Sequence, residues 1–227
     1  MRPMEPTDIL GNIKLYNADC MEVMKTFKDK QFDLAIVDPP YFDGPNKLGY
    51  YGMDISKTKV KRQSYNIIAS WDVPKQEYYD EVLRVSKEQI IWGINYFNFL
   101  NVPTGRLVWD KKKNDSCTFS DGEIASCSAI ETVRFFRYTW DGFIQENMKN
   151  KQKKIHPTEK PVQLYKWLLQ NYAKEGDTIL DTHFGSLSIG IACHDMKFDL
   201  TAIELDKDYY EQAKQRLIYH QRQLTLF

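Results

Sequence analysis

Four short runs rich in isoleucine, valine and leucine stand out along the chain. They occupy residues 32–37, 89–94, 178–181 and 200–205. Continuous apolar runs of this length are typical of strands that are buried on both faces, as in a parallel sheet. We therefore expect these four segments to form the centre of a parallel β-sheet.

Between these runs, apolar residues recur at helical spacing. Residues 78–85 and 162–172 show this spacing, and a last helix is expected to begin near Asp206, whose carboxylate suits an N-cap. Strands that alternate with helices predict a Rossmann-like, doubly wound and mostly parallel α/β sheet. The length allows one domain of this kind or two small ones, and we interpret residues 1–227 as a single domain.

Two segments interrupt the alternation. Residues 42–70 contain several glycines and a proline, and they predict a long mobile loop. Residues 110–155 contain a predicted strand at 132–138 followed by a polar, basic stretch, and we interpret them as an inserted segment. Long loops in a compact α/β domain usually carry function, so we expect both segments to border the ends of the strands.

The charges of the chain balance, with 31 Lys and Arg residues against 31 Asp and Glu residues. A polyanion would therefore have to bind at clustered charge on one face. Basic clusters occur at residues 57–62, 111–113 and 149–154; one such cluster is usually solvated surface, but three together favour an anionic ligand. The residues that we select as candidate contacts to nucleic acid are Lys57, Lys59, Lys61, Arg62, Trp140, Lys149, Lys151, Lys153 and Lys154.

Hydrophobic residues make up 42% of the chain, which is enough for a packed core and excludes disorder as a description of the whole. No apolar run approaches the roughly 18 to 20 residues that cross a bilayer, and no signal-like segment follows Met1. The four cysteines are scattered without a Cys-x-x-Cys pair, and no histidine stands at metal-ligand spacing. We therefore expect a cytoplasmic protein with no membrane contact and no bound metal.

The run at residues 32–37 leads directly into Asp38, Pro39, Pro40 and Tyr41. Doubly wound sheets bind ligands at the carboxyl ends of their strands. The prolines hold the segment extended, so the Asp38 carboxylate and the Pro39 carbonyl offer two acceptors beside an aromatic ring. This set suits a planar base with an exocyclic amine, although the motif alone would equally fit a capping Asp and a proline turn.

The run at residues 178–181 ends at Asp181, and a sharp turn of small residues then precedes a helix expected from Ser188. Glu204 ends the next run, where an acidic residue usually binds the hydroxyls of a ribose. A Gly-x-Gly-x-x-Gly fingerprint is absent, so the turn offers no evident cradle for a pyrophosphate. The turn residues that we select as cofactor contacts are Thr182, His183, Gly185 and Ser186.

A possible carboxylate site precedes the helix expected at residues 162–172. Thr158 is a candidate N-cap, and Lys160 is expected near the positive end of that helix, where a carboxylate is stabilised. Adenosine at Glu204, a sulfonium near Asp181 and an amino-acid carboxylate near Thr158 or Lys160 describe S-adenosylmethionine better than they describe a dinucleotide.

The Asp38 motif and residues 156–210 resemble the DNA methyltransferases that modify exocyclic amines of bases. The resemblance implies the class I methyltransferase fold and S-adenosylmethionine as the cofactor. Because the base-binding motif precedes the cofactor motif, the order is the circularly permuted one called the beta class. The resemblance also implies that Asp38, Pro39, Pro40 and Tyr41 are catalytic, and that Asp19 and Cys20 contact the cofactor's adenine. Asp19 fits a helix N-cap equally well.

In this family, Asp and Tyr at the ends of the four-residue motif mostly mark adenine, whereas Ser in place of the Asp mostly marks cytosine. The resemblance therefore implies methyl transfer to N6 of adenine in double-stranded DNA, with the target base flipped out of the duplex. Residues 42–70 would face the DNA, and residues 110–155 would include the region that recognises the target. No cysteine follows a proline, so covalent attack on a cytosine ring is not expected.

Several alternatives stay open. The same acceptors suit N4 of cytosine, and a DNA-binding protein could keep this fold without turnover. An oxidoreductase is a third alternative, against which the missing glycine fingerprint speaks. The sequence leaves open a homodimer, a cognate restriction endonuclease as a partner, and the DNA site that is recognised.

The cofactor turn departs from the usual family form, which has Asp-Pro-Phe and later Gly-Ser-Gly. Thr182, His183 and Leu187 stand in place of the Pro, the Phe and the last Gly. A leucine disfavours positive φ, so cofactor contacts around this turn have less support than those of Asp181 and Glu204.

Overall fold

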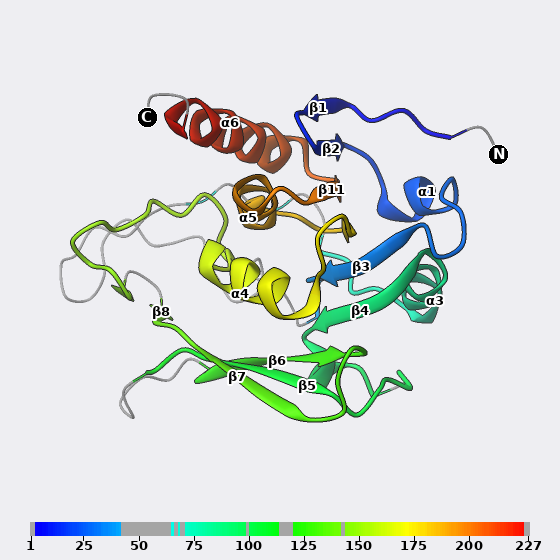
Figure 1. Cartoon of the computed structure of the whole chain (residues 1–227), viewed down its shortest axis with the longest axis horizontal. Coiled ribbons are helices and arrows are strands. Elements are labelled where there is room, and N and C mark those ends of the chain that lie inside the picture. The colour runs from blue at the N-terminus through cyan, green and yellow to red at the C-terminus, as the bar shows by residue number, and fades with distance from the viewer. Residues whose placement is uncertain are drawn as a thin grey trace.

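A computed structural model of the chain describes residues 3–41, 65, 68, 71–98, 100–113, 120–141 and 144–224. Within these ranges, nine strands form one sheet with the order β1-β2-β11-β10-β3-β4-β6-β5-β7 (Figure 1). These strands are β1 (Asp8–Leu10), β2 (Ile13–Tyr16), β3 (Phe32–Val37), β4 (Ser86–Trp92), β5 (Arg106–Asp110), β6 (Gly122–Cys127), β7 (Val133–Arg137), β10 (Thr178–Asp181) and β11 (Asp199–Ile203).

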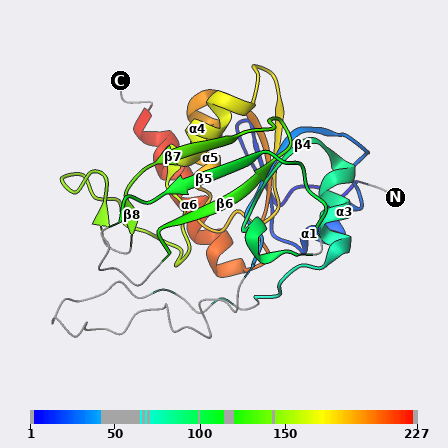
Figure 2. The ribbon, with the colours of Figure 1, turned by 90° about the horizontal axis from the view of Figure 1, so that it is seen from below.

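The centre of the sheet is parallel. Strands β2, β11, β10, β3 and β4 all pair in parallel, with Leu34 of β3 opposite Ile179 of β10. Beyond β4, strand β6 is antiparallel to both β4 and β5, and β7 pairs in parallel with β5 (Figure 2). The expected mostly parallel α/β sheet is therefore confirmed.

Helices cover both faces of the sheet, as the doubly wound class requires. Along β3, Leu34 and Ile36 join the core on one face, while Ala35 and Val37 join the core on the other, because successive side chains of a strand point to opposite sides. The first core includes α4 (Val162–Tyr172), α5 (Ser188–Met196) and α6 (Lys207–Leu224), and the second includes α1 (Cys20–Met24) and α3 (Gln76–Val85).

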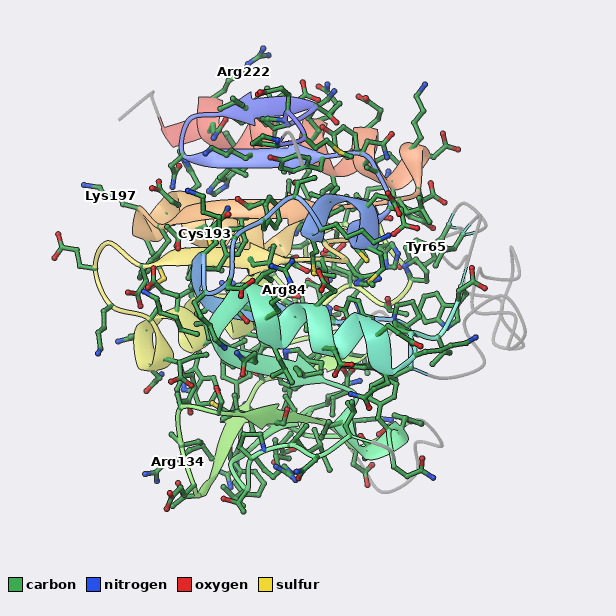
Figure 3. All side chains as sticks on the ribbon, turned by 90° about the vertical axis from the view of Figure 1, so that its right-hand side faces the viewer. Tyr65, Arg84, Arg134, Cys193, Lys197 and Arg222 are labelled. Atoms are coloured by element: carbon green, nitrogen blue, oxygen red, sulfur yellow. The ribbon has the colours of Figure 1, made fainter. Side chains whose placement is uncertain are left out.

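Figure 3 faces the side of the molecule that carries α1 and α3. Arg84, labelled there on α3, donates to the carbonyl oxygens of Met24 and Phe27 at 2.8 and 2.9 Å, and pairs with Glu81 and Asp29. These bonds fasten α3 to the end of α1. Both helices contribute to the wall of the site described below.

Several predicted elements have the bounds that the sequence indicated. The runs at residues 32–37 and 178–181 and the helix at 162–172 agree with β3, β10 and α4. The run placed at 89–94 begins earlier, at Ser86, and ends at Trp92. It ends there because Gly93 adopts φ +71° and starts a 3-10 turn, Ile94–Tyr96.

The helix ends follow the predicted caps in two cases. Asp206 accepts hydrogen bonds from the amides of Asp208 and Tyr209, directly before α6 begins at Lys207. Asp19 caps α1 by accepting from the amide of Met21 at 2.7 Å. The run expected at residues 200–205 forms β11, which begins one residue earlier, at Asp199, and ends two residues earlier, at Ile203.

The interpretation of residues 110–155 as one inserted segment differs from the structure. The expected strand at 132–138 is present as β7, but β6 from the same segment lies between β4 and β5 inside the main sheet. The part that stands apart from the sheet begins with the short pair β8 (Trp140–Asp141) and β9 (Ile144–Gln145). Apart from Tyr65 and Ile68, the predicted loop at 42–70 lies outside the described residues.

No helix within the described ranges is both long enough and apolar enough to cross a membrane.

Candidate active site

Three acidic residues mark the carboxyl ends of neighbouring central strands. Asp181 is the last residue of β10, Glu204 follows β11 directly, and Asp38 follows β3. The chain leaves β10 toward α5 on one face and leaves β3 toward α3 on the other, so the sheet reverses its winding between these two strands. Ligands of open α/β sheets bind in the crevice at such a switch point.

A cavity of about 530 Å³ opens at this place. Of the predicted catalytic residues, Asp38 and Pro40 line the cavity, whereas Pro39 and Tyr41 do not. Every predicted cofactor residue except Asp181 also lines it, namely Asp19, Cys20, Thr158, Lys160, Thr182, His183, Gly185, Ser186 and Glu204. The structure thus brings together residues from both ends of the sequence around one cavity.

Asp38 belongs to a cluster of opposite charges. Its Oδ2 atom lies 2.5 Å from the Nζ atom of Lys160, whose side chain is only 2% exposed. The same ammonium lies 2.8 Å from Glu123 Oε2, and Lys111 lies 2.7 Å from Glu123 Oε1. The other oxygen of Asp38, Oδ1, is buried and has no hydrogen-bond partner among the residues that the structure describes. An unpaired buried acceptor is costly, so it indicates a place for a donor from a ligand.

The pKa values in this cluster follow from burial and from the shared ammonium. Burial and the charge of Glu123 raise the pKa of Asp38, against the opposing effect of Lys160. Burial would also raise the pKa of Glu123, but Lys160 and Lys111 outweigh it and lower the value to about 2. Burial would lower the pKa of Lys160, but the two carboxylates outweigh it and raise the value.

The side chain of Tyr41 is held by contacts with Glu123, Tyr96 and Gly93. Its hydroxyl donates to Glu123 Oε2 at 3.1 Å, and its ring stacks on Tyr96 with a centroid distance of 5.0 Å. The ring also lies against Gly93, where a Cβ atom would come within 2.2 Å of Tyr41 Cδ1, so only glycine leaves room for it. The ring is therefore fixed in place by its neighbours.

Two buried carboxyl groups lie in the other half of the site: Glu204 lines the cavity, and Asp181 directly precedes the lining residue Thr182. Asp181 is 1% exposed and accepts from the amide of His183 at 3.0 Å. Glu204 accepts from the amides of Gly185 and Asp206, each at 2.9 Å. Burial is the main cause that raises the pKa of Asp181 to about 8 and that of Glu204 to about 7. Positive charge in the cavity would stabilise both ionised forms.

The histidines of the cavity are uncharged. Burial lowers the pKa of His183 to about 4 and that of His156 to about 3. The Nδ1 atom of His183 lies 3.0 Å from the hydroxyl of Thr182, which in turn lies 2.5 Å from the hydroxyl of Tyr78 on α3. This chain of polar contacts ties the turn after β10 to the helix on the opposite wall.

The turn before α5 contains a backbone feature that the sequence did not indicate. Leu187 adopts φ +56°, the left-handed conformation that leucine disfavours. Its side chain is fully buried and packs on Gly190, where a Cβ atom would lie 2.7 Å from Leu187 Cγ. Burial of the leucine offsets a backbone cost of about 1 to 3 kcal/mol. The turn thus takes a glycine-like shape without glycine.

One expectation about the segment before α4 is wrong, and a second gains no support from the structure. Thr158 does not cap the helix, because α4 begins at Val162 with Pro161 at the N-cap position and no side-chain cap. The amide and hydroxyl of Thr158 contact Nδ1 of His156 instead. The Lys160 ammonium is already held by two carboxylates, so its assignment to a cofactor carboxylate lacks support.

The structure separates the predicted nucleic-acid contacts into three groups. Lys57, Lys59, Lys61 and Arg62 lie outside the described residues, and Lys149, Lys151 and Lys153 are exposed. Trp140 is 4% exposed and donates its indole N–H to the carbonyl of Glu159, while the buried Lys154 lies over its ring at 4.7 Å. These two side chains pack against each other, which does not support their selection as DNA contacts.

Sequence reasoning missed Glu123 and Tyr78. Each lies in an element that looks ordinary in the sequence, and neither forms part of a short motif. Glu123 lies on β6, which pairs with β4 and β5, and the local sequence pattern gave no sign of this pairing. For Tyr78 the apolar helical spacing of residues 78–85 predicted burial but gave no sign of the hydroxyl contact.

The chain matches a family model of the N6 and N4 methyltransferases, described as DNA methylase, over residues 95–215. It is 38% identical to the type II methyltransferase M.HpaI of Haemophilus parainfluenzae, over 90% of this chain and 74% of that protein. It is 25% identical to the type II methyltransferase M2.MboI of Moraxella bovis, over 92% of this chain and 88% of that protein.

Solved structures show the same fold. A complex of M1.HpyAVI with SAM matches with a TM-score of 0.56 and 21% identity, over 90% of this chain and 100% of that one. The PvuII DNA methyltransferase, which is cytosine-N4-specific, matches with a TM-score of 0.60 and 12% identity, over 95% of this chain and 90% of that one. The chain therefore belongs to the N6/N4 DNA methylase family and is a type II DNA methyltransferase that uses S-adenosylmethionine.

Proposed function

We propose that the enzyme transfers the methyl group to N6 of adenine in double-stranded DNA. The observation that carries this proposal is the Oδ1 atom of Asp38, a buried acceptor without a partner at the edge of the cavity. A carboxylate oxygen in this state suits an amine N–H, which both adenine and cytosine present. The choice of adenine is supported by Asp at the first position and Tyr at the fourth position of the motif.

The proposed chemistry is direct displacement: the amine nitrogen would bond to the methyl carbon as the carbon–sulfur bond of the donor breaks, a thioether would leave, and the proton lost by the amine would pass to solvent. The amine of adenine is a poor nucleophile because its lone pair is delocalised into the ring. Hydrogen bonds from the amine to Asp38 Oδ1 and to the Pro39 carbonyl favour a pyramidal nitrogen with the lone pair directed at the methyl group. Lys160 holds the other Asp38 oxygen, so the carboxylate positions the amine more than it removes its proton.

S-adenosylmethionine supplies an activated methyl group on a sulfonium. The site fits this cation, because the lining residue Glu204 and the neighbouring Asp181 are buried carboxyl groups whose ionised forms positive charge would stabilise. In our proposal Glu204 binds the ribose hydroxyls, Asp181 lies near the positive groups, and Asp19 accepts from the adenine amine. His183 and His156 also line the cavity. Their rings are neutral, so they add no positive charge that would repel the sulfonium.

The target base has to leave the duplex to reach Asp38, at a cost of a few kcal/mol. Two features support DNA approaching from the side of β8 and β9. Lys149, Lys151 and Lys153 are exposed in the segment that follows β9, and the same segment leads to His156 and Thr158 at the cavity. These lysines would neutralise phosphates without reading the sequence.

A second candidate acceptor is N4 of cytosine. The PvuII DNA methyltransferase, which is cytosine-N4-specific, has the same fold and favours considering it. Product analysis separates the two. The enzyme is incubated with unmethylated DNA of mixed sequence and S-adenosylmethionine, and the digested nucleosides are identified by mass spectrometry. N6-methyldeoxyadenosine is the expected product, and N4-methyldeoxycytidine as the product would overturn the proposal. The Asp38→Ala variant serves as the control for adventitious methylation.

A further inference from the structure

The carboxylate of Glu123 is divided between three partners of the active site. Its Oε1 atom lies 2.7 Å from Lys111, while its Oε2 atom lies 2.8 Å from Lys160 and accepts from the hydroxyl of Tyr41 at 3.1 Å. Lys160 in turn holds Oδ2 of Asp38. Glu123 therefore contacts Lys160, which holds Asp38, and also Tyr41, at the other end of the same segment. It does not itself line the cavity.

We propose that Glu123 is a positioning residue of the methyl transfer. It holds the Lys160 ammonium and the Tyr41 hydroxyl at one carboxylate oxygen, and thereby keeps Lys160 on Oδ2 of Asp38 while Oδ1 stays available to the target amine. This inference rests on the proposed role of Asp38 as the acceptor of the amine.

The charge count of the cluster supports this role. Two ammonium groups, those of Lys111 and Lys160, face two carboxylates, those of Asp38 and Glu123. Without the Glu123 charge, Asp38 would be the only carboxylate among the described residues at salt-bridge distance from Lys160. An ammonium with one buried carboxylate partner gains from contact with both of its oxygens, because each such bond is charge-assisted. Oδ1 would then be occupied, and the amine would lose its acceptor.

The position of Glu123 is set by close strand pairing. Glu123 pairs with Trp109 across β5 and β6, next to Gly122. A Cβ atom at Gly122 would lie 2.5 Å from the carbonyl oxygen of Trp109, so the two backbones approach too closely for any larger residue. This approach fixes where the carboxylate enters the cluster. The antiparallel strand β6, which lies between β4 and β5, thus contributes a residue to the active site.

Other titratable groups also face Asp38. Asp181 at the end of β10 and Tyr165 on α4 interact electrostatically with it, in addition to Lys160, Glu123 and Lys111. Of these, Glu123 raises the pKa of Asp38, whereas Lys160 and Lys111 lower it. Removal of Glu123 and removal of Lys111 should therefore shift the ionisation of Asp38 in opposite directions. This pair of shifts would show that both charges act on Asp38, while the rate at a pH where Asp38 is ionised reports the positioning role of Glu123.

The test compares single-turnover methyl transfer at saturating DNA and cofactor over a range of pH. For Glu123→Gln we expect a rate lower by about 10-fold to 100-fold, with the cofactor Kd changed less than about threefold. The acidic limb of its pH profile should move to lower pH. Glu123→Asp, which keeps the charge, should retain the wild-type limb. The control Glu81→Gln removes a carboxylate that is ion-paired with Arg84 outside the cluster, and it should leave rate and limb unchanged.

Lys111→Gln is the second variant. If Glu123→Gln does not fold, Lys111→Gln alone provides the test. Its acidic limb should move to higher pH. A wild-type rate for Glu123→Gln, or a lower rate with no shift of the limb in either variant, would overturn the positioning role. Asp38→Ala is measured in parallel. If that variant keeps its activity, the proposed function is wrong. If Asp38→Ala is inactive but the Glu123 and Lys111 variants are unaffected, only the positioning role of Glu123 is wrong.

Discussion

The ammonium of Lys160 lies 2.5 Å from Oδ2 of Asp38, although 122 positions separate the two residues in the sequence. The contact joins the end of β3 to the segment that opens α4. It engages one oxygen of Asp38 and leaves Oδ1 without a partner. The segment that we assign to the target base is therefore held by a residue from the distant part of the sequence that precedes α4.

Replacing Asp38 should damage chemistry more than cofactor binding. Asp38→Ala removes an acceptor that the proposal uses mainly at the reacting nitrogen, so we expect turnover to fall by at least ~100-fold with nearly unchanged cofactor affinity. Asp38→Asn has a single acceptor oxygen, which the Lys160 ammonium would hold, so its NH2 group would face the amine and its rate should be close to that of the alanine variant. Rates from labelled cofactor and affinities from calorimetry check this. An equal loss in rate and cofactor affinity would contradict the assigned role.

Glu204 should matter for the cofactor rather than for DNA. In our proposal its carboxylate binds ribose hydroxyls, which Glu204→Ala would leave unpaired in a buried place. We expect cofactor binding to weaken by about 1 to 3 kcal/mol. Glu211→Ala, which removes an exposed carboxylate on α6, provides the control. Unchanged affinity of Glu204→Ala in calorimetry would place the ribose elsewhere.

Asp181 should make the protein without cofactor less stable as the pH rises. Burial raises its pKa to about 8 in the folded state, whereas an unfolded Asp ionises near its ordinary value of about 4. Between these values the folded state binds more protons, so stability falls with increasing pH. Asp181→Asn should therefore raise Tm little at pH 5 and more at pH 8, where each gain of about 1 kcal/mol corresponds to roughly 2 to 4 °C.

The control for this shift has the opposite sign. The side-chain hydrogen bond from Lys87 and the backbone amide of Thr178 lower the pKa of Asp33, so its ionised form stabilises the fold above its unfolded pKa. Asp33→Asn should lower Tm at neutral pH, with a difference that shrinks as the pH falls below about 4. A Tm of Asp181→Asn that stays at or below the wild type across the range would refute the account of Asp181.

The exposed lysines after β9 should contribute affinity for DNA without sequence preference. Replacing Lys149, Lys151 and Lys153 by Gln should weaken binding to all duplexes and flatten the salt dependence by about one unit of slope per lost phosphate contact. Cofactor affinity should not change. Lys154→Gln should instead lower stability, because that side chain is packed over Trp140. If the triple variant keeps both DNA affinity and salt slope, this segment is ordinary solvated surface.

The sequence predicted those parts of the fold whose signal is local. Continuous apolar runs located β3 and β10, and the turn chemistry around Asp19 and Asp206 located two helix starts. Strand β6 was not predicted, because this antiparallel strand has mixed polarity and no crossover helix. Its membership of the main sheet depends on pairing with β4, which local pattern does not encode.

The candidate site was predictable to the same extent. Acidic residues at strand ends indicated Asp38, Asp181 and Glu204, because a doubly wound topology brings such ends together. The partners of these residues were not predictable, since the contacts of Glu123 and Lys160 join distant segments. The backbone conformation of Leu187 was not predictable either. Its left-handed conformation is disfavoured locally and is stabilised by the burial of its side chain in the folded chain.

The central claim is that the amine of adenine is the methyl acceptor and that Asp38 holds it. The most direct measurement uses duplex DNA whose adenine amines carry a heavy nitrogen isotope, together with cofactor whose methyl group carries an isotopic label. The product nucleosides of the wild type and of Asp38→Ala are identified by mass spectrometry and fragmentation. We predict that the labelled methyl group is bonded to the labelled nitrogen, and that this product falls by at least ~100-fold in the variant. A labelled methyl group on cytosine, or an undiminished yield from Asp38→Ala, would contradict the account.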